Sequence, residues 1–130
     1  MCLKSTISTI KYHPAGTFVS YGRRFQTARR TRMGVVAAGY ADGLPRRSSN
    51  QCSYLVAGKQ APQLGTICMD MCMVDLTDIP DARVGSEVEL FGPENSILAL
   101  TDAAGTIPYE LLCSVTKRVP RVYLEGGKPV

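Results

Sequence analysis

The chain has 130 residues, of which 45% are hydrophobic and 20% charged, and its formal net charge is +4. This length and composition are typical of one globular domain and exclude a disordered or collagen-like chain. No apolar run approaches the roughly 20 residues of a membrane-spanning helix, and the N-terminus lacks the apolar core of a signal peptide. Together with five cysteines, an odd number, this predicts free thiols in the reducing cytoplasm and no membrane partner.

Strands dominate the predicted secondary structure, because β-branched and alternating residues fill short segments between Gly and Pro turns. A hairpin is predicted where Gly58-Lys59 separates two of these segments. The expected strands are residues 3–12, 17–25, 33–38, 53–57, 60–64, 66–69, 71–76 and 86–91, and residues 119–123 should form a last strand or an extended arm.

Helical signals appear only near the C-terminus. Residues 96–104 suit a short helix that Gly105 ends, and Pro108 suits the first turn of a second helix. No helix connects the earlier strands, so the sheet should be antiparallel. The fold class is therefore mainly β, an antiparallel barrel-like domain with two short helices near the C-terminus. We expect this domain to span residues 1–125, followed by a flexible tail at 126–130.

Common catalytic and metal-binding patterns are weak in this chain. The one histidine, His13, lies beside a Pro-Gly turn and has no evident nucleophilic partner. Cys68 and Cys72 lack the further ligands of a zinc site, so no metal site is predicted. Five arginines between Arg23 and Arg32 could contact phosphates, but no nucleic-acid-binding motif surrounds them. A strand face or an interface with another domain is the favoured interpretation of this cluster.

Two positions suggest a ligand. Tyr40 lies in a glycine-flanked loop after a buried strand, where it could present its phenol to a ligand, and Arg46 and Arg47 could lower its pKa. A structural tyrosine is the alternative. Asp70 lies within an apolar run, which suggests a β-bulge whose free N–H groups could bind a carboxylate. A buried aspartate with a backbone partner is the alternative there.

Eight stretches, taken together and in order, resemble the C-terminal domain of alanine racemases. They are residues 19–23 (VSYGR), 39–46 (GYADGLPR), 56–59 (VAGK), 65–71 (GTICMDM), 74–76 (VDL), 85–88 (GSEV), 105–113 (GTIPYELLC) and 118–123 (RVPRVY).

This resemblance implies an enzyme that uses pyridoxal 5′-phosphate (PLP) to interconvert L- and D-alanine, for the supply of peptidoglycan precursors. It implies an N-terminal α/β barrel that carries the Schiff-base lysine, and a homodimer whose active sites take groups from both subunits. The resemblance also assigns residues. Tyr40 would be the second base, acting on the α-proton of L-alanine. The backbone N–H of Met69, beside Asp70, would hold the substrate carboxylate. Both would serve the partner subunit's site, whereas Tyr109 would bind the PLP phosphate in its own subunit.

No barrel or Schiff-base lysine is present in this chain. We therefore expect a fragment of a racemase that is inactive on its own. The related serine racemases remain an alternative, since Thr66 does not exclude serine as the substrate. A stand-alone binding module, for RNA or another anion, and a dimerisation domain are the non-catalytic alternatives.

Overall fold

A computed structural model describes all residues, 1–130, and confirms a mainly β fold with a closed antiparallel barrel and two helices. Six strands form the barrel: β1 (Leu3–His13), β2 (Thr31–Val36), β3 (Ser53–Val56), β4 (Lys59–Leu64), β5 (Cys72–Asp75) and β6 (Glu87–Phe91). The helices are α1 (Ile97–Ala104) and α2 (Pro108–Ser114), and three single 3₁₀ turns are η1 (Tyr21–Arg23), η2 (Tyr40–Asp42) and η3 (Arg46–Ser48). A small second sheet consists of β7 (Leu124–Glu125) and β8 (Lys128–Pro129).

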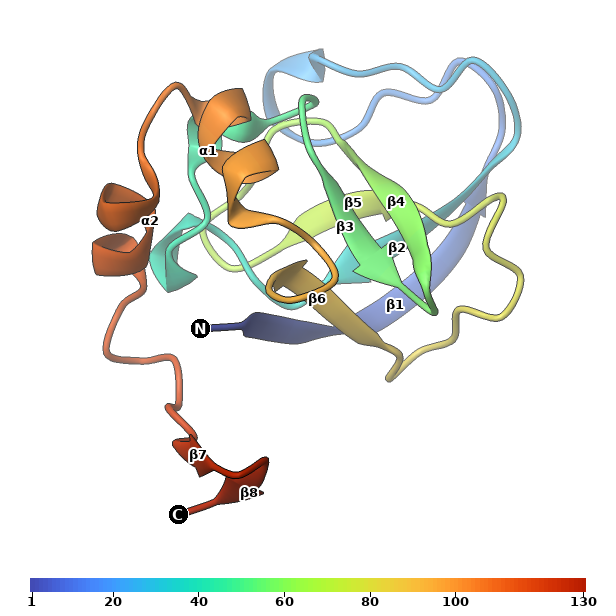
Figure 1. The fold of residues 1–130 in the computed structure, drawn as a ribbon. Coiled ribbons are helices and arrows are strands. Elements are labelled where there is room, and N and C mark those ends of the chain that lie inside the picture. The colour runs from blue at the N-terminus through green and yellow to red at the C-terminus, as the bar shows by residue number, and fades with distance from the viewer.

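Strand β1 closes the barrel, whose order is β1-β2-β5-β4-β3-β6 (Figure 1). Its first residues, 3–6, pair with β6, and residues 7–13 pair with β2. A register shift in each of these pairings bends the strand, which lets one long strand belong to both sides of the barrel.

The barrel interior holds one cluster of apolar side chains. Each strand contributes at least one residue that is no more than 1% exposed: Ile7, Val36, Val56, Ala61, Val74 and Val88 are examples. Burying a Val or Ile side chain contributes about 1.5–3 kcal/mol relative to leaving it exposed. The predicted hairpin between β3 and β4 is confirmed, but its turn residues are Ala57 and Gly58, both at positive φ, and Lys59 already belongs to β4.

Both helices begin where local chemistry predicts, α1 also ends there, and the two lie together on one side of the barrel (Figure 1). The Ser96 hydroxyl accepts the Leu98 N–H at the start of α1, and Gly105 takes the left-handed conformation after its end. Pro108 is the first residue of α2, whose Leu111 is buried against the core. Before α1, the Glu89 carboxylate accepts the N–H groups of Glu94 and Asn95. Neither helix combines the length and apolar character that a membrane crossing requires.

The prediction of a strand over residues 17–25 is wrong. Only one bridge, Phe18 with Gln26, joins the two arms of this segment. The backbone reverses between them because Ser20, Gly22 and Arg23 adopt positive φ angles, which no continuous strand contains.

The predicted strand at 66–69 is also absent, and of the two alternatives for residues 119–123, a last strand or an extended arm, the strand is not formed. Gly65, with φ of 75°, ends β4, and residues 66–71 form a loop before β5. Residues 119–123 have no neighbouring strand, and a strand without a partner leaves its ladder groups unpaired.

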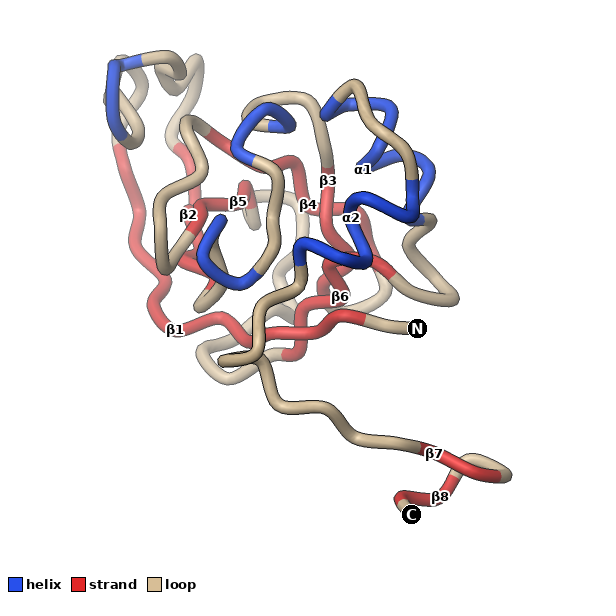
Figure 2. Tube along the Cα trace, turned by 90° about the vertical axis from the view of Figure 1, so that its left-hand side faces the viewer, coloured by secondary structure: helices blue, strands red, loops and turns tan.

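The last residues leave the barrel. Figure 2 shows β7 and β8 forming a small hairpin at the end of an extended segment, away from the body of the molecule. The hairpin is regular structure within the predicted tail, and the flexibility of residues 126–130 stays a prediction.

Candidate functional site

Two loops that the sequence singled out run side by side at one edge of the barrel. The loop of residues 39–43 follows β2, and the loop of residues 66–71 joins β4 to β5. The Tyr40 N–H donates to the Cys68 carbonyl at 3.0 Å, and the Ala41 N–H donates to the Met69 carbonyl at 2.9 Å. Backbone hydrogen bonds therefore hold Tyr40 next to Met69, which are 29 positions apart.

The 66–71 loop leaves backbone donors free. The Cys68 N–H donates to the Met71 carbonyl at 3.0 Å, which closes a tight turn over Met69 and Asp70. The N–H groups of Met69 and Asp70 donate to no acceptor in the chain. The predicted β-bulge is thus replaced by a turn, but the turn has the property for which the bulge was invoked, namely free N–H groups that can bind an anion.

Tyr40 presents its phenol to the surface. Tyr40 is 42% exposed, and its hydroxyl makes no hydrogen bond within the chain. Neither Arg46 nor Arg47 forms a hydrogen bond with the Tyr40 hydroxyl, so no direct contact supports the predicted effect of these arginines on Tyr40.

Both glycines of the 39–43 loop permit close backbone approaches. A side chain at Gly39 would overlap the carbonyl oxygens of Cys68 and Met69. A Cβ at Gly43, where φ is 112°, would lie 2.7 Å from the Cα of Val115. The loop is therefore packed between the 66–71 loop and the segment that follows α2.

That segment, residues 115–121, we call the strap. Its Arg118 bonds to both loops: Nε donates to Oδ1 of Asp42 at 2.8 Å, and Nη2 donates to Oδ1 of Asp70 at 2.7 Å. The other carboxylate oxygen of Asp42 accepts the Gly39 N–H at 2.9 Å. Burial alone would raise the pKa of Asp42, but these two donors outweigh it and hold that pKa below its ordinary value.

A second tyrosine, Tyr21, lies on a turn that is bonded to the 66–71 loop. Ser20 Oγ donates to the Thr66 carbonyl at 2.5 Å, and Thr66 Oγ1 donates to the Tyr21 carbonyl at 2.9 Å. Ser20 has φ of 63° and ψ of −174°, a conformation that almost only glycine adopts and that costs about 1–3 kcal/mol. Tyr21 is 73% exposed. Tyr21 lies in the VSYGR stretch, but the sequence alone does not indicate it as a site residue.

Tyr109 forms no hydrogen bond with either of these two loops. It is the second residue of α2, 76% exposed, and its hydroxyl has no partner in the chain. The structure therefore brings together Tyr40, Met69 and Asp70 and leaves Tyr109 on the helix. Arg118 was missed because only the folded chain reveals which carboxylates it meets.

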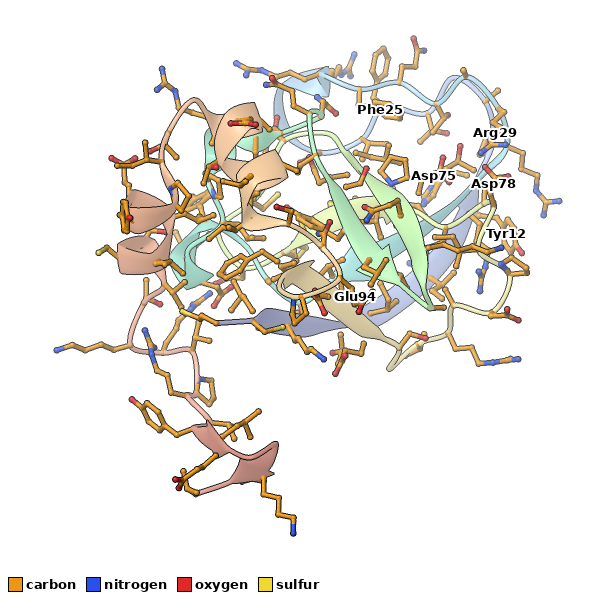
Figure 3. The ribbon with its side chains drawn as sticks, in the orientation of Figure 1. Tyr12, Phe25, Arg29, Asp75, Asp78 and Glu94 are labelled. Atoms are coloured by element: carbon orange, nitrogen blue, oxygen red, sulfur yellow. The ribbon has the colours of Figure 1, made fainter.

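Three members of the arginine cluster, Arg29, Arg30 and Arg32, make contacts within the chain. Figure 3 shows Arg29 beside Asp75 and Asp78, and its Nη2 lies 2.7 Å from Oδ2 of Asp78. Arg30 stacks on the ring of Tyr12, and Arg32 donates to the carbonyls of Ile79 and Ala82. These contacts explain much of the cluster as a structural feature of the fold.

Comparison with known families agrees with the motifs. The family model described as "Alanine racemase, C-terminal domain" matches residues 1–123. The chain belongs to this family.

Similar proteins in the alanine racemase family include full enzymes. The chain is 48% identical over 124 residues to the alanine racemase of Pseudomonas taetrolens, which covers 95% of the chain and 34% of that protein. It is similar to the crystal structure of the biosynthetic alanine racemase from Pseudomonas aeruginosa, with a TM-score of 0.92, 42% identity and coverage of 95% and 35%. It is also similar to the crystal structure of the alanine racemase from Bartonella henselae, which was solved with covalently bound pyridoxal phosphate. The TM-score is 0.90 and the identity 34%, over 95% of this chain and 34% of that one.

The racemase-family chain spans about a third of the length of the curated relatives it matches. The relatives are racemases, which are isomerases, and the part matched here is their C-terminal domain. The hydroxyl of Tyr109 is exposed and has no partner within the chain, so it is available to an outside acceptor such as a phosphate.

Proposed function

We propose that this chain is the C-terminal domain of a PLP-dependent alanine racemase, which interconverts L- and D-alanine for cell-wall precursors in the cytoplasm. The observation that carries the proposal is the pairing of the 39–43 and 66–71 loops, which sets an exposed Tyr40 beside the free N–H of Met69. A phenol and an anion-binding N–H at one edge suit an amino acid, whose carboxylate and α-proton are adjacent.

The roles follow from stereochemistry. Inverting the α-carbon needs one base on each face, and PLP, when bound, supplies the electron sink that makes the α-proton removable. Tyr40 takes or returns the proton on one face. The N–H of Met69, with Asp70 beside it, orients the substrate carboxylate, and the hydroxyl of Tyr109 would hold the cofactor phosphate.

The edge is open in the single chain, which supports a site completed by another surface. Two surface depressions, one beside Lys4 and Glu87 and one beside Asn50 and Gln63, contain none of the proposed site residues. We propose that the loops complete the partner subunit's site in a homodimer, and that the isolated chain does not racemise alanine.

A second candidate for the base is Tyr21, which the strained backbone of its turn favours. Ser20 has a costly conformation, and hydrogen bonds join Ser20 and Tyr21 to Thr66; such conformations are concentrated at functional sites. Both tyrosines are bonded through their backbones to the loop that contains Met69, so a direct comparison of the two is required.

The test joins this chain to the part of the Pseudomonas taetrolens enzyme that lies outside the matched domain. We expect racemisation of alanine by the fusion and none by the chain alone. Tyr40→Phe should lower kcat at least about 100-fold and raise the α-deuterium isotope effect for L-alanine more than for D-alanine. Tyr21→Phe is measured in parallel.

The outcomes separate the assignments. If Tyr21→Phe gives the directional isotope effect and Tyr40→Phe does not, the base is Tyr21. If neither variant changes the isotope effect, this domain supplies no base. A kcat/KM that is higher for L-serine than for L-alanine would favour the serine racemase alternative.

A further inference from the structure

We propose that Arg118 is a positioning residue that ties the 39–43 loop to the 66–71 loop, and so sets the geometry between the tyrosine and the Met69 N–H. The inference rests on the proposed function. It concerns a residue that touches neither substrate nor cofactor in that proposal and acts through Asp42 and Asp70.

The contacts of Arg118 reach one carboxylate from each loop. Its Nε–Asp42 distance is 2.8 Å and its Nη2–Asp70 distance is 2.7 Å. Asp42 is two residues from Tyr40, and Asp70 is adjacent to Met69. The rigid planar fork of a guanidinium can bond two carboxylates in fixed directions, which the point charge of a lysine cannot do.

The two loops also depend on Arg118 because their direct pairing is small. Only two backbone hydrogen bonds, from Tyr40 and Ala41, cross between them. The Arg118 side chain is 48% exposed, and exposed ion pairs contribute little to global stability. Its effect should therefore be local, on the separation of the loops.

The strap holds the backbone of Arg118 in place. Arg121 donates to the carbonyls of Val115, Thr116 and Val119 at 2.6–2.8 Å. Thr116 Oγ1 donates to the Ala41 carbonyl at 2.7 Å. The strap is thus fixed to itself and to the 39–43 loop before Arg118 reaches across to Asp70.

Charge adds a second, separable effect. Arg118 neutralises part of the negative charge of Asp42 and Asp70, close to the N–H groups proposed to hold the substrate carboxylate. Without that positive charge, the carboxylates of Asp42 and Asp70 would repel the substrate carboxylate and raise KM, and salt would screen this repulsion. Loss of the geometric tie would lower kcat, and salt would not restore it.

The kinetic test compares Arg118→Lys and Arg118→Gln in the fusion enzyme. We expect both variants to lower kcat about tenfold or more, because neither side chain offers donors in the fixed, separate directions in which the guanidinium meets the two carboxylates. Arg118→Gln should in addition raise KM, and 0.5 M salt should reduce that rise. A wild-type kcat in Arg118→Lys would overturn the proposal, since the charge alone would then suffice.

A second measurement uses the 130-residue chain and does not depend on activity. In Arg118→Gln, hydrogen exchange at the Tyr40 and Ala41 N–H groups should become at least tenfold faster, whereas Val35 and Val74 in the barrel should not change. The matched control is Arg29→Gln, which removes another arginine–aspartate pair and should leave Tyr40 and Ala41 unchanged.

The two measurements separate the two possible failures. An inactive fusion that retains Arg118 contradicts the proposed function. The exchange measurement then still tests whether Arg118 holds the two loops together. Unchanged exchange at Tyr40 and Ala41 in Arg118→Gln overturns the positioning role, whatever the activity of the fusion.

Discussion

Asp42 illustrates how one carboxylate can stabilise a loop. Its two oxygens accept from different donors, Arg118 Nε and the Gly39 N–H, and its side chain is only 17% exposed. Because these donors hold the pKa of Asp42 below its unfolded value of about 3.9, Asp42 contributes stability above that value. The contribution is lost as pH falls below about 4 through the lower, folded pKa.

We therefore expect Asp42→Asn to lower the free energy of unfolding at pH 7 by about 1 kcal/mol. The difference between the variant and the original chain should shrink as the pH falls below about 4, because the original chain loses the same charge there. Urea unfolding between pH 7 and pH 3 measures this.

Asp78→Asn is the control for Asp42→Asn. Asp78 also has a lowered pKa, through its hydrogen bond to Arg29, but its side chain is 79% exposed. Its effect should be smaller and should vanish in high salt. A difference for Asp42→Asn that stays constant from pH 7 to pH 3 would show that the carboxylate charge does not contribute.

Individual site residues could be predicted only where a local pattern marks them. Tyr40 stands between two glycines and Asp70 interrupts an apolar run, so the sequence draws attention to these two, whereas Met69 is indicated only by the resemblance to alanine racemases. Arg118 meets Asp42 and Asp70 across separations of 76 and 48 residues, and no local pattern encodes such contacts. The strain at Ser20 is equally invisible, because serine does not predict a positive φ.

At the level of the strands, β2 packs unusually close to the segment that follows β5. Gly34 lies opposite Val74, and a Cβ at Gly34 would stand 2.5 Å from Cδ1 and 3.2 Å from Cγ of Leu76. It would also approach Cδ1 of Ile7 at 3.3 Å. Leu76 is fully buried, so it has no free space into which it can move.

Gly34→Ala should therefore destabilise the barrel by about 1–3 kcal/mol through overpacking. This loss exceeds the gain that alanine gives by lowering the conformational entropy of the unfolded chain. Leu76→Val removes atoms from the crowded place. The double variant should be more stable than the sum of the two single variants predicts. Urea unfolding of the four proteins gives this coupling energy, and strict additivity would contradict the packing argument.

Elements with a local signal were predicted, and elements defined by distant partners were not. The β3–β4 hairpin and both helices carry their own turn and capping residues, and all three are confirmed. The segments 17–25 and 66–69, predicted as strands, and 119–123, predicted as a strand or an extended arm, have suitable residue types, but positive φ angles or missing partners prevent strand formation. Strand formation depends on what lies beside the segment, which the segment itself does not record.

For the whole molecule, the antiparallel barrel could be predicted as a class, whereas its closure could not. Closure requires β1 to pair with β6, and the paired residues lie far apart in the chain, as Leu3 and Phe91 do. The barrel, the helices and the strap then form one body. Val115, at the start of the strap, is buried in the core cluster, and Arg121, at its end, donates to the Val115 carbonyl.

The end of that body can be located by truncation. Residues from 122 onward are all exposed, and their backbone bonds stay within the terminal hairpin (Figures 1 and 2). A chain that ends after Arg121 should keep the melting temperature of the 130-residue chain, because no contact of the barrel is lost. A chain that ends after Ser114 loses the buried Val115 and every bond of the strap, so its melting temperature should fall by several degrees, consistent with roughly 1–3 kcal/mol. Thermal unfolding followed by circular dichroism distinguishes the two, and an equal loss in both chains would mean that the terminal hairpin stabilises the barrel.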